Sequence, residues 1–160
     1  MSHPYKEFEP NWVRGEFPKD SYRSIFKWGD PLEIKAPRES LYRMLKEKFD
    51  MSDADFAAYT EDTGFDQVKF DIPVGLPESD LAEFRKIVGG DFVRTDDYAR
   101  LSVAYGKTMY DLLRLRNKIV ENVPDAVLYP DTKEQIEQIV AYCAKEKIPV
   151  YVYGGGSSVT

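Results

Sequence analysis

Residues 124–132 read Pro-Asp-Ala-Val-Leu-Tyr-Pro-Asp-Thr, and residues 148–158 read Ile-Pro-Val-Tyr-Val-Tyr-Gly-Gly-Gly-Ser-Ser. Each stretch holds a compact apolar run bounded by proline or glycine, which is typical of a buried strand. The residues between them show the apolar spacing of a helix face. A strand, a helix and a second strand joined by short links predict a right-handed βαβ unit with parallel strands.

The helix between the two strands has a predicted start and an apolar face. Asp131 is the expected N-cap, with Glu134 at the matching capping-box position. Cys143 is the one cysteine of the chain, which excludes an intrachain disulfide, and we expect it to be a small core residue. The residues predicted to face the core are Ile136, Ile139, Val140 and Cys143.

Two further regions precede these stretches. Residues 1–37 are rich in proline and aromatic side chains, which predicts an extended arm that docks through Phe26, Trp28 and their neighbours. A flexible tail is the favoured alternative for residues 1–20. Residues 38–123 predict a mostly helical region with loops. Because the predicted βαβ unit follows this region, the expected fold class is α+β.

Helical spacing and capping signals locate the elements of residues 38–123. Ser52 and Asp55 form a capping box that opens a short helix, and Gly89 ends another. The remaining expected elements are helices over 38–50, 78–88 and 108–116, and one short strand over 68–72.

The helix expected over 108–116 should point Met109, Leu112 and Leu113 inward. Three nearby arginines, Arg100, Arg114 and Arg116, are candidate anion contacts. The favoured alternative is that they cover apolar surface with their stems and pair with acidic side chains.

The charge balance limits the classes of partner. Among 160 residues, 22 Lys and Arg stand against 28 Asp and Glu, a formal charge of −6. An acidic chain repels phosphate backbones, so we expect no nucleic-acid partner. The chain shows neither a basic-then-apolar signal segment nor an apolar run of about 18 residues. The expected location is cytoplasmic, with peripheral membrane attachment as the alternative and no transmembrane segment.

The glycines that follow the second predicted strand form the candidate binding site. Residues 154–158 are three glycines and two serines. Glycines there allow backbone N–H groups to approach a phosphate, and the serines add hydroxyl donors. Ligands of open α/β sheets bind beyond the carboxyl ends of strands. A flexible linker and a plain turn remain as alternatives.

These stretches resemble the start of a vanillyl-alcohol-oxidase (PCMH)-type FAD-binding domain, and most of all the alkyldihydroxyacetonephosphate (alkylglycerone-phosphate) synthase-like group of that superfamily. Those proteins carry a P-D-x-V-x-x-P strand and a P-x-G-G-G-T-S loop. Upstream, Arg100 with residues 104–106 and 113–116 resembles the group's R-x-x-x-A-x-G and L-x-R stretch. Residues 26–30 resemble its K-W-x-G-W-G motif in shortened form.

The resemblance implies FAD as the cofactor of a flavoprotein, with residues 124–160 as the incomplete start of the FAD-binding domain. Val152 stands where the group has proline, and Ser157 stands where it has threonine. Ser157 also occupies the position of the histidine that attaches FAD covalently in some members, so noncovalent binding is expected. The implied cofactor-binding residues are Val152, Tyr153, Gly154, Gly155, Gly156, Ser157 and Ser158.

The resemblance further implies a reaction. Alkyldihydroxyacetonephosphate synthases exchange the acyl chain of acyl-dihydroxyacetone phosphate for a fatty alcohol, a transferase step of ether-lipid biosynthesis. The expectation is an N-terminal fragment of such an enzyme, a homodimer at full length, that supplies the FAD pyrophosphate loop and is inactive alone. It assigns no catalytic residue and no metal ligand within residues 1–160. The alternatives are an FAD-linked oxidase or dehydrogenase (oxidoreductase) of a 2-hydroxy acid and a noncatalytic folded fragment.

Overall fold

The computed structural model describes residues 19–26, 38–58, 64 and 66–156. Its contacts divide the chain into two compact units, the first up to Gln67 and the second from Val68 onward. The sequence-based boundaries after residues 37 and 123 stay a prediction. No helix in the described ranges has both the length and the apolar character needed to cross a membrane.

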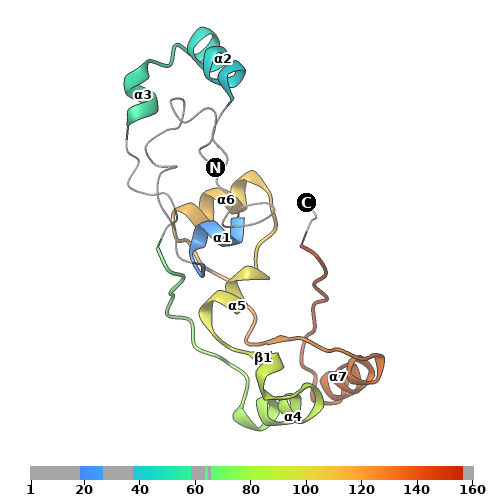
Figure 1. Cartoon of the computed structure of the whole chain (residues 1–160). Coiled ribbons are helices and arrows are strands. Elements are labelled where there is room, and N and C mark those ends of the chain that lie inside the picture. Colours follow the sequence, from blue (N-terminus) through green and yellow to red (C-terminus); the bar gives the residue numbers. More distant parts are fainter. Residues whose placement is uncertain (1–18, 27–37, 59–63, 65, 157–160) are drawn as a thin grey trace. The chain divides into compact units, whose positions relative to one another are not determined.

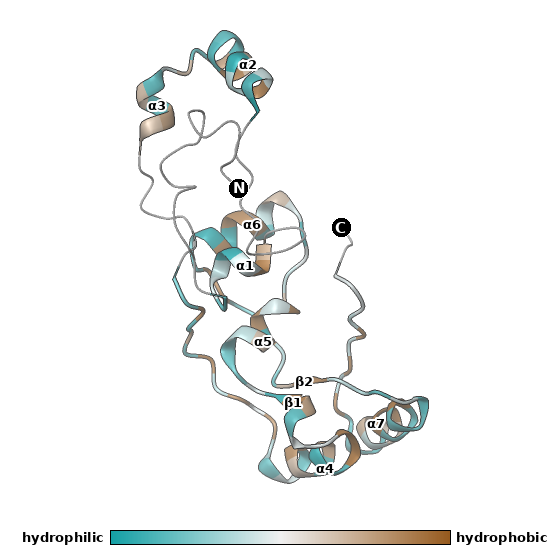
Figure 2. Ribbon diagram, in the orientation of Figure 1, coloured by the Kyte–Doolittle hydropathy of each residue, from teal (hydrophilic) through white to brown (hydrophobic). Residues whose placement is uncertain are grey.

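The first unit contains three helices: α1 (Tyr22–Phe26), α2 (Glu39–Phe49) and α3 (Asp53–Ala57). The capping box is confirmed, because Asp55 N–H donates to the Ser52 hydroxyl and the Asp55 carboxylate accepts from Ser52 N–H. Tyr42 of α2 packs on Phe56 of α3 with ring centroids 4.6 Å apart. Figure 2 shows that α2 carries both hydrophilic and hydrophobic residues.

The predicted extended arm is only partly described. Residues 22–26 form the short helix α1 rather than extended chain. The N–H groups of Tyr22 and Arg23 donate to the carbonyls of Asp66 and Gly64, so α1 is held by backbone bonds. Trp28 and the rest of the arm, residues 1–18 and 27–37, lie outside the described residues.

The second unit is built around a core shared by two helices and a small sheet. In Figure 1, α4 and α7 lie beside β1 at one end of this unit. Leu81, Phe84 and Val88 of α4 pack with Val93 of β1 and with Ile139 and Cys143 of α7. The elements are α4 (Glu78–Val88), the 3-10 turn η3 (Gly90–Phe92), β1 (Val93–Arg94), α5 (Asp97–Ser102), α6 (Met109–Arg116), β2 (Val127–Leu128) and α7 (Lys133–Glu146).

The α+β class is confirmed, but the strands pair differently from the predicted βαβ unit. β2 lies inside the first predicted strand and pairs antiparallel with β1, with Val93 opposite Leu128. Residues 150–153, the second predicted strand, run without a ladder in the described part of the chain. A strand needs a neighbour to accept and donate its backbone bonds, and this segment has none within residues 66–156.

The strand predicted over residues 68–72 is also absent, and side chains hold the backbone there instead. Asp97 accepts from Phe70 N–H at 3.2 Å, and Asp125 accepts from Gly75 N–H at 2.6 Å. The Arg100 guanidinium donates to the carbonyls of Ile72 and Pro73. These bonds satisfy backbone groups that a sheet ladder would otherwise satisfy.

The N-cap of helix α7 lies one residue later than predicted. Thr132, not Asp131, is the N-cap, and its hydroxyl accepts from Gln135 N–H. Gln135 completes the capping box and donates from Nε2 to the Ile87 carbonyl of α4 at 3.1 Å. The bond to α4 explains why Gln135 and not Glu134 is the capping-box residue. The Gln135 amide can donate to a carbonyl, whereas the carboxylate of Glu134 has no hydrogen to donate.

Helix α6 begins after its predicted start, and Thr108 is its N-cap. Its buried residue is Leu115, whereas Met109 is 68% exposed and Leu113 is 45% exposed. The inward direction predicted for Met109 and Leu113 was therefore wrong, whereas Leu112 is half-buried. Three-and-four spacing defines a stripe of leucines, but it does not say which stripe meets the core.

Candidate cofactor site

The glycine loop continues directly from the extended segment 150–153. Tyr151 is 92% exposed and Val152 is 98% exposed, so these side chains make few contacts with the rest of the second unit. The loop reaches Gly156 in the structure. Ser157 and Ser158, the other two residues of the predicted site, lie outside the described residues.

The three glycines of the loop differ in what a Cβ atom at each position would meet. A Cβ placed on Gly154 or on Gly155 would meet no atom within 4 Å. Nothing in this part of the chain therefore requires glycine there, whereas a ligand that approaches the backbone closely would require it. Gly156 is different: its φ is +61°, and a Cβ on it would lie 1.9 Å from the Tyr153 hydroxyl.

The backbone of the loop is open to a ligand. In residues 149–156, the Tyr153 hydroxyl donates to the Ser102 carbonyl at 3.4 Å, and no other hydrogen bond joins this segment to the described part of the chain. The N–H groups of Gly154, Gly155 and Gly156 thus have no protein acceptor among the described residues. Adjacent unbonded N–H groups without Cβ atoms fit the oxygens of a pyrophosphate.

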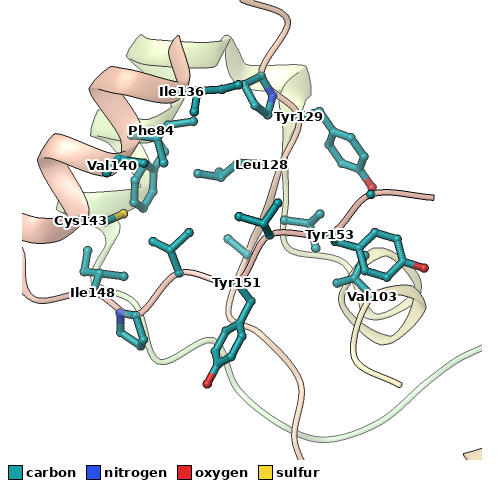
Figure 3. Close-up of a pocket in the computed structure, with 18 of the residues that line it drawn as sticks. Phe84, Val103, Leu128, Tyr129, Ile136, Val140, Cys143, Ile148, Tyr151 and Tyr153 are labelled. Atoms are coloured by element: carbon teal, nitrogen blue, oxygen red, sulfur yellow. The ribbon is translucent and has the colours of Figure 1, made fainter. Parts of the chain in front are cut away.

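An apolar cavity of about 650 Å³ lies beside this loop. Figure 3 shows Ile136, Val140 and Cys143 of α7 on one side of it, Leu128 in the middle, and Tyr151 and Tyr153 along the other side. Among the described residues, its lining is mostly apolar and contains no Lys, Arg or His side chain, although Tyr151, Tyr153 and Gly154 also border it. The glycine backbone at the edge of the cavity, and not its apolar walls, is therefore the candidate site for a phosphate.

The other candidates have structural roles. Cys143 is 3% exposed, and burial, followed by the charge of Asp80, raises the pKa of its thiol. It is a core residue, as predicted. Arg114 pairs with Asp111 and Glu121 at 3.9 and 4.0 Å, as expected for a surface arginine. Within the described ranges, no group of three or more His, Cys, Asp or Glu residues could hold a metal ion.

Arg100 departs from the expected pairing with acids. Its side chain is 2% exposed and donates to the carbonyl of Pro124 from Nε at 2.8 Å, in addition to the two carbonyls of residues 72 and 73. The guanidinium also lies over the ring of Phe70, 5.3 Å from its centroid. Arg100 thus joins two loops and is not available to an anion.

Comparison with known proteins identifies the loop region. Residues 124–160 match the family model of an FAD binding domain. The alkyldihydroxyacetonephosphate synthase of Trypanosoma brucei brucei is 36% identical over 78 residues, which are 49% of this chain and 13% of that protein. The mitochondrial cytochrome D-lactate dehydrogenase of Arabidopsis thaliana is 37% identical over 38 residues, 24% of this chain and 7% of that enzyme.

A solved structure of alkyldihydroxyacetonephosphate synthase superimposes on 57% of this chain and 17% of its own, with a TM-score of 0.53 and 30% sequence identity. The chain thus spans less than a fifth of the length of each of these relatives. The longer sequence match and the structural match are both to alkyldihydroxyacetonephosphate synthases. The chain is similar to the alkyldihydroxyacetonephosphate synthases, residues 124–160 match the FAD binding domain family, and these matches indicate FAD as the cofactor.

Proposed function

We propose that residues 152–158 bind the pyrophosphate of FAD noncovalently. The observation that carries the proposal is the open backbone at Gly154 and Gly155, where the N–H groups have no acceptor among the described residues and a Cβ would meet no neighbour. Backbone N–H groups can hold a phosphate without a basic patch, which suits a chain with a formal charge of −6.

The enzyme to which this loop contributes is, in our proposal, an FAD-dependent transferase of the alkyldihydroxyacetonephosphate synthase type. It would exchange the acyl chain of acyl-dihydroxyacetone phosphate for a fatty alcohol, with the bound flavin supplying the chemistry. The residues of this chain bind and orient the cofactor, and none is assigned a catalytic step. Support comes from the 36% identity and from the structural likeness to synthases.

A second candidate is an FAD-linked dehydrogenase of a 2-hydroxy acid. The match to a D-lactate dehydrogenase supports it, but that match covers 38 residues, against 78 for the synthase. Both candidates use the same loop, because the cofactor and not the substrate is what the loop would hold. Activity assays with the two substrate classes on the full enzyme separate them.

The loop can be tested with a pair of glycine variants. Gly155→Ala places a methyl group where FAD would approach, while Gly90→Ala in η3 adds a methyl group that also meets nothing within 4 Å. We expect both variants to keep the wild-type unfolding midpoint. Fluorescence titration with FAD should show weaker binding by Gly155→Ala and unchanged binding by Gly90→Ala. Equal FAD affinity in all three proteins would remove the loop from the site.

The affinity of the chain for FAD, and whether FAD is bound covalently, need separate measurements. We expect the 160-residue chain to bind FAD at equilibrium but to lose it on desalting, since it matches under a fifth of the length of the relatives. Acid precipitation of the loaded protein should leave the flavin in the supernatant. Flavin in the pellet contradicts noncovalent attachment, and no saturable binding at all favours a noncatalytic folded chain.

A further inference from the structure

The side chain of Tyr153 connects the glycine loop to helix α5. Its hydroxyl donates to the Ser102 carbonyl at 3.4 Å, and Ser102 is the last residue of α5. Carbonyls in the last turn of a helix have no partner within the helix, and they carry the negative end of its dipole. A phenol hydroxyl is a suitable donor for such a carbonyl. In Figure 3, Tyr153 lies beside Val103 at this end of α5, while Tyr151 points away.

Tyr153 also lies against the loop itself. A Cβ on Gly156 would lie 1.9 Å from the Tyr153 hydroxyl oxygen and 2.6 Å from Cζ of the ring. The chain thus turns back over its own tyrosine, with φ of +61° at Gly156. The same oxygen meets the end of α5 on one side and the turn of the loop on the other.

We propose that Tyr153 is the positioning residue of the FAD loop, and that it fixes residues 154–156 on the C-terminal end of α5. The inference rests on the proposed FAD-binding role of this loop. Segment 150–153 has no strand ladder in the described structure, so its backbone does not hold the loop in place. The tyrosine supplies this restraint from its side chain.

The consequence is an entropic contribution to cofactor affinity. N–H groups that converge on a pyrophosphate must be ordered when FAD binds, and a loop already fixed loses less conformational freedom on binding. Removal of the hydroxyl should therefore weaken FAD binding without contact between that hydroxyl and the cofactor. The loss expected for one hydrogen bond corresponds to a rise in Kd of about three- to tenfold.

The test compares Tyr153→Phe with Tyr151→Phe, a matched loss of one hydroxyl from a tyrosine that is 92% exposed. Backbone ¹⁵N relaxation of the 160-residue chain without FAD reports the order of Gly154, Gly155 and Gly156. We expect order parameters to fall in Tyr153→Phe, toward the range below about 0.6 that marks flexible backbone, and to stay unchanged in Tyr151→Phe. Unchanged order in Tyr153→Phe overturns the proposal.

Titration with FAD and with riboflavin completes the test. Tyr153→Phe should raise the Kd for FAD, while any weak binding of riboflavin, which lacks the pyrophosphate, should be unchanged. Lower order in the loop with an unchanged Kd for FAD also overturns the proposal. Absence of FAD binding by the wild type would contradict the proposed function instead. The order parameters would still decide whether the bond from Tyr153 to Ser102 holds the loop in place.

Discussion

The Tyr142 hydroxyl of α7 donates a 2.8 Å hydrogen bond to Oδ1 of Asp80 in α4. The same ring meets Phe84 edge-on, with centroids 5.4 Å apart and planes at 80°. One tyrosine therefore joins the two helices through a polar bond at its tip and an aromatic contact along its ring. These contacts hold α7, which precedes the glycine loop in the sequence, against α4.

The first prediction concerns pH. The bond to Asp80, then desolvation, raises the pKa of Tyr142 to about 12, against about 10 in an unfolded chain. A group that binds its proton more tightly when folded stabilises the fold below the unfolded pKa, and that contribution is lost as the pH rises from about 10 to about 12. The difference in urea midpoint between wild type and Tyr142→Phe should be constant at pH 7–9 and shrink above pH 10.

Tyr151→Phe is the control for this measurement, because Tyr151 is 92% exposed. It should leave the urea midpoint at pH 8 unchanged. A wild-type advantage over Tyr142→Phe that grows above pH 10 would show that the bond to Asp80 does not form as described.

The second prediction concerns Arg100, whose guanidinium donates to the carbonyls of Ile72, Pro73 and Pro124. Arg100→Met leaves these carbonyls without a donor in a region where the side chain is 2% exposed. The free energy of unfolding should fall by about 3 kcal/mol. Lys86→Met removes an exposed ion pair with Glu83 and should cost under about 1 kcal/mol in the same urea titration. Equal losses would argue against a buried Arg100.

The third prediction distinguishes the two possible caps of α7. Thr132→Ala should cost about 1 kcal/mol, because the Thr132 hydroxyl accepts from Gln135 N–H. Asp131→Ala should change the unfolding free energy by less than about 0.5 kcal/mol, because its side chain does not cap the helix. Thermal unfolding followed by circular dichroism measures both. The reverse order of the two losses would restore the cap predicted from the sequence.

The fourth prediction concerns the reactivity of Cys143. Its thiol is buried and its pKa is raised by desolvation, so little thiolate is present and a reagent reaches it only when the core opens. Reaction with Ellman's reagent at pH 8 should be roughly 100-fold slower than in urea, if access requires an opening of about 3 kcal/mol. A rate equal to that of the unfolded chain would place Cys143 outside the core.

Several elements could be predicted because their signals are local. The α4 helix runs from Glu78 to Val88, the bounds expected from its apolar spacing and from Gly89. The Ser52 and Asp55 capping box forms as predicted, since both partners lie within one turn. The glycine loop was found by its composition and by its place after an apolar run. FAD as the cofactor is confirmed by the match of residues 124–160 to the FAD binding domain family, while the role of the loop stays a prediction.

Other elements depended on contacts between residues far apart in the sequence. The six-residue helix α5 had no expected counterpart, although Asp96 caps it. Arg100 was expected to pair with acids, but carbonyls 24 to 28 residues away are its acceptors. The anchor from Tyr153 to Ser102 spans 51 residues. The spacing of residues along the sequence does not indicate which residues so far apart will be hydrogen-bond partners.

The sequence by itself located most of the longer helices, and it singled out the glycine loop that we propose as the cofactor site. Hydrogen bonds and side-chain conformations within a few residues fix those features. Only the tertiary structure decided that β2 pairs antiparallel with β1, that residues 150–153 form no strand ladder, and that Tyr153 meets α5. The physical reason is that a strand or an anchored loop is defined by its partner, and the partner is brought near by the fold rather than by the chain.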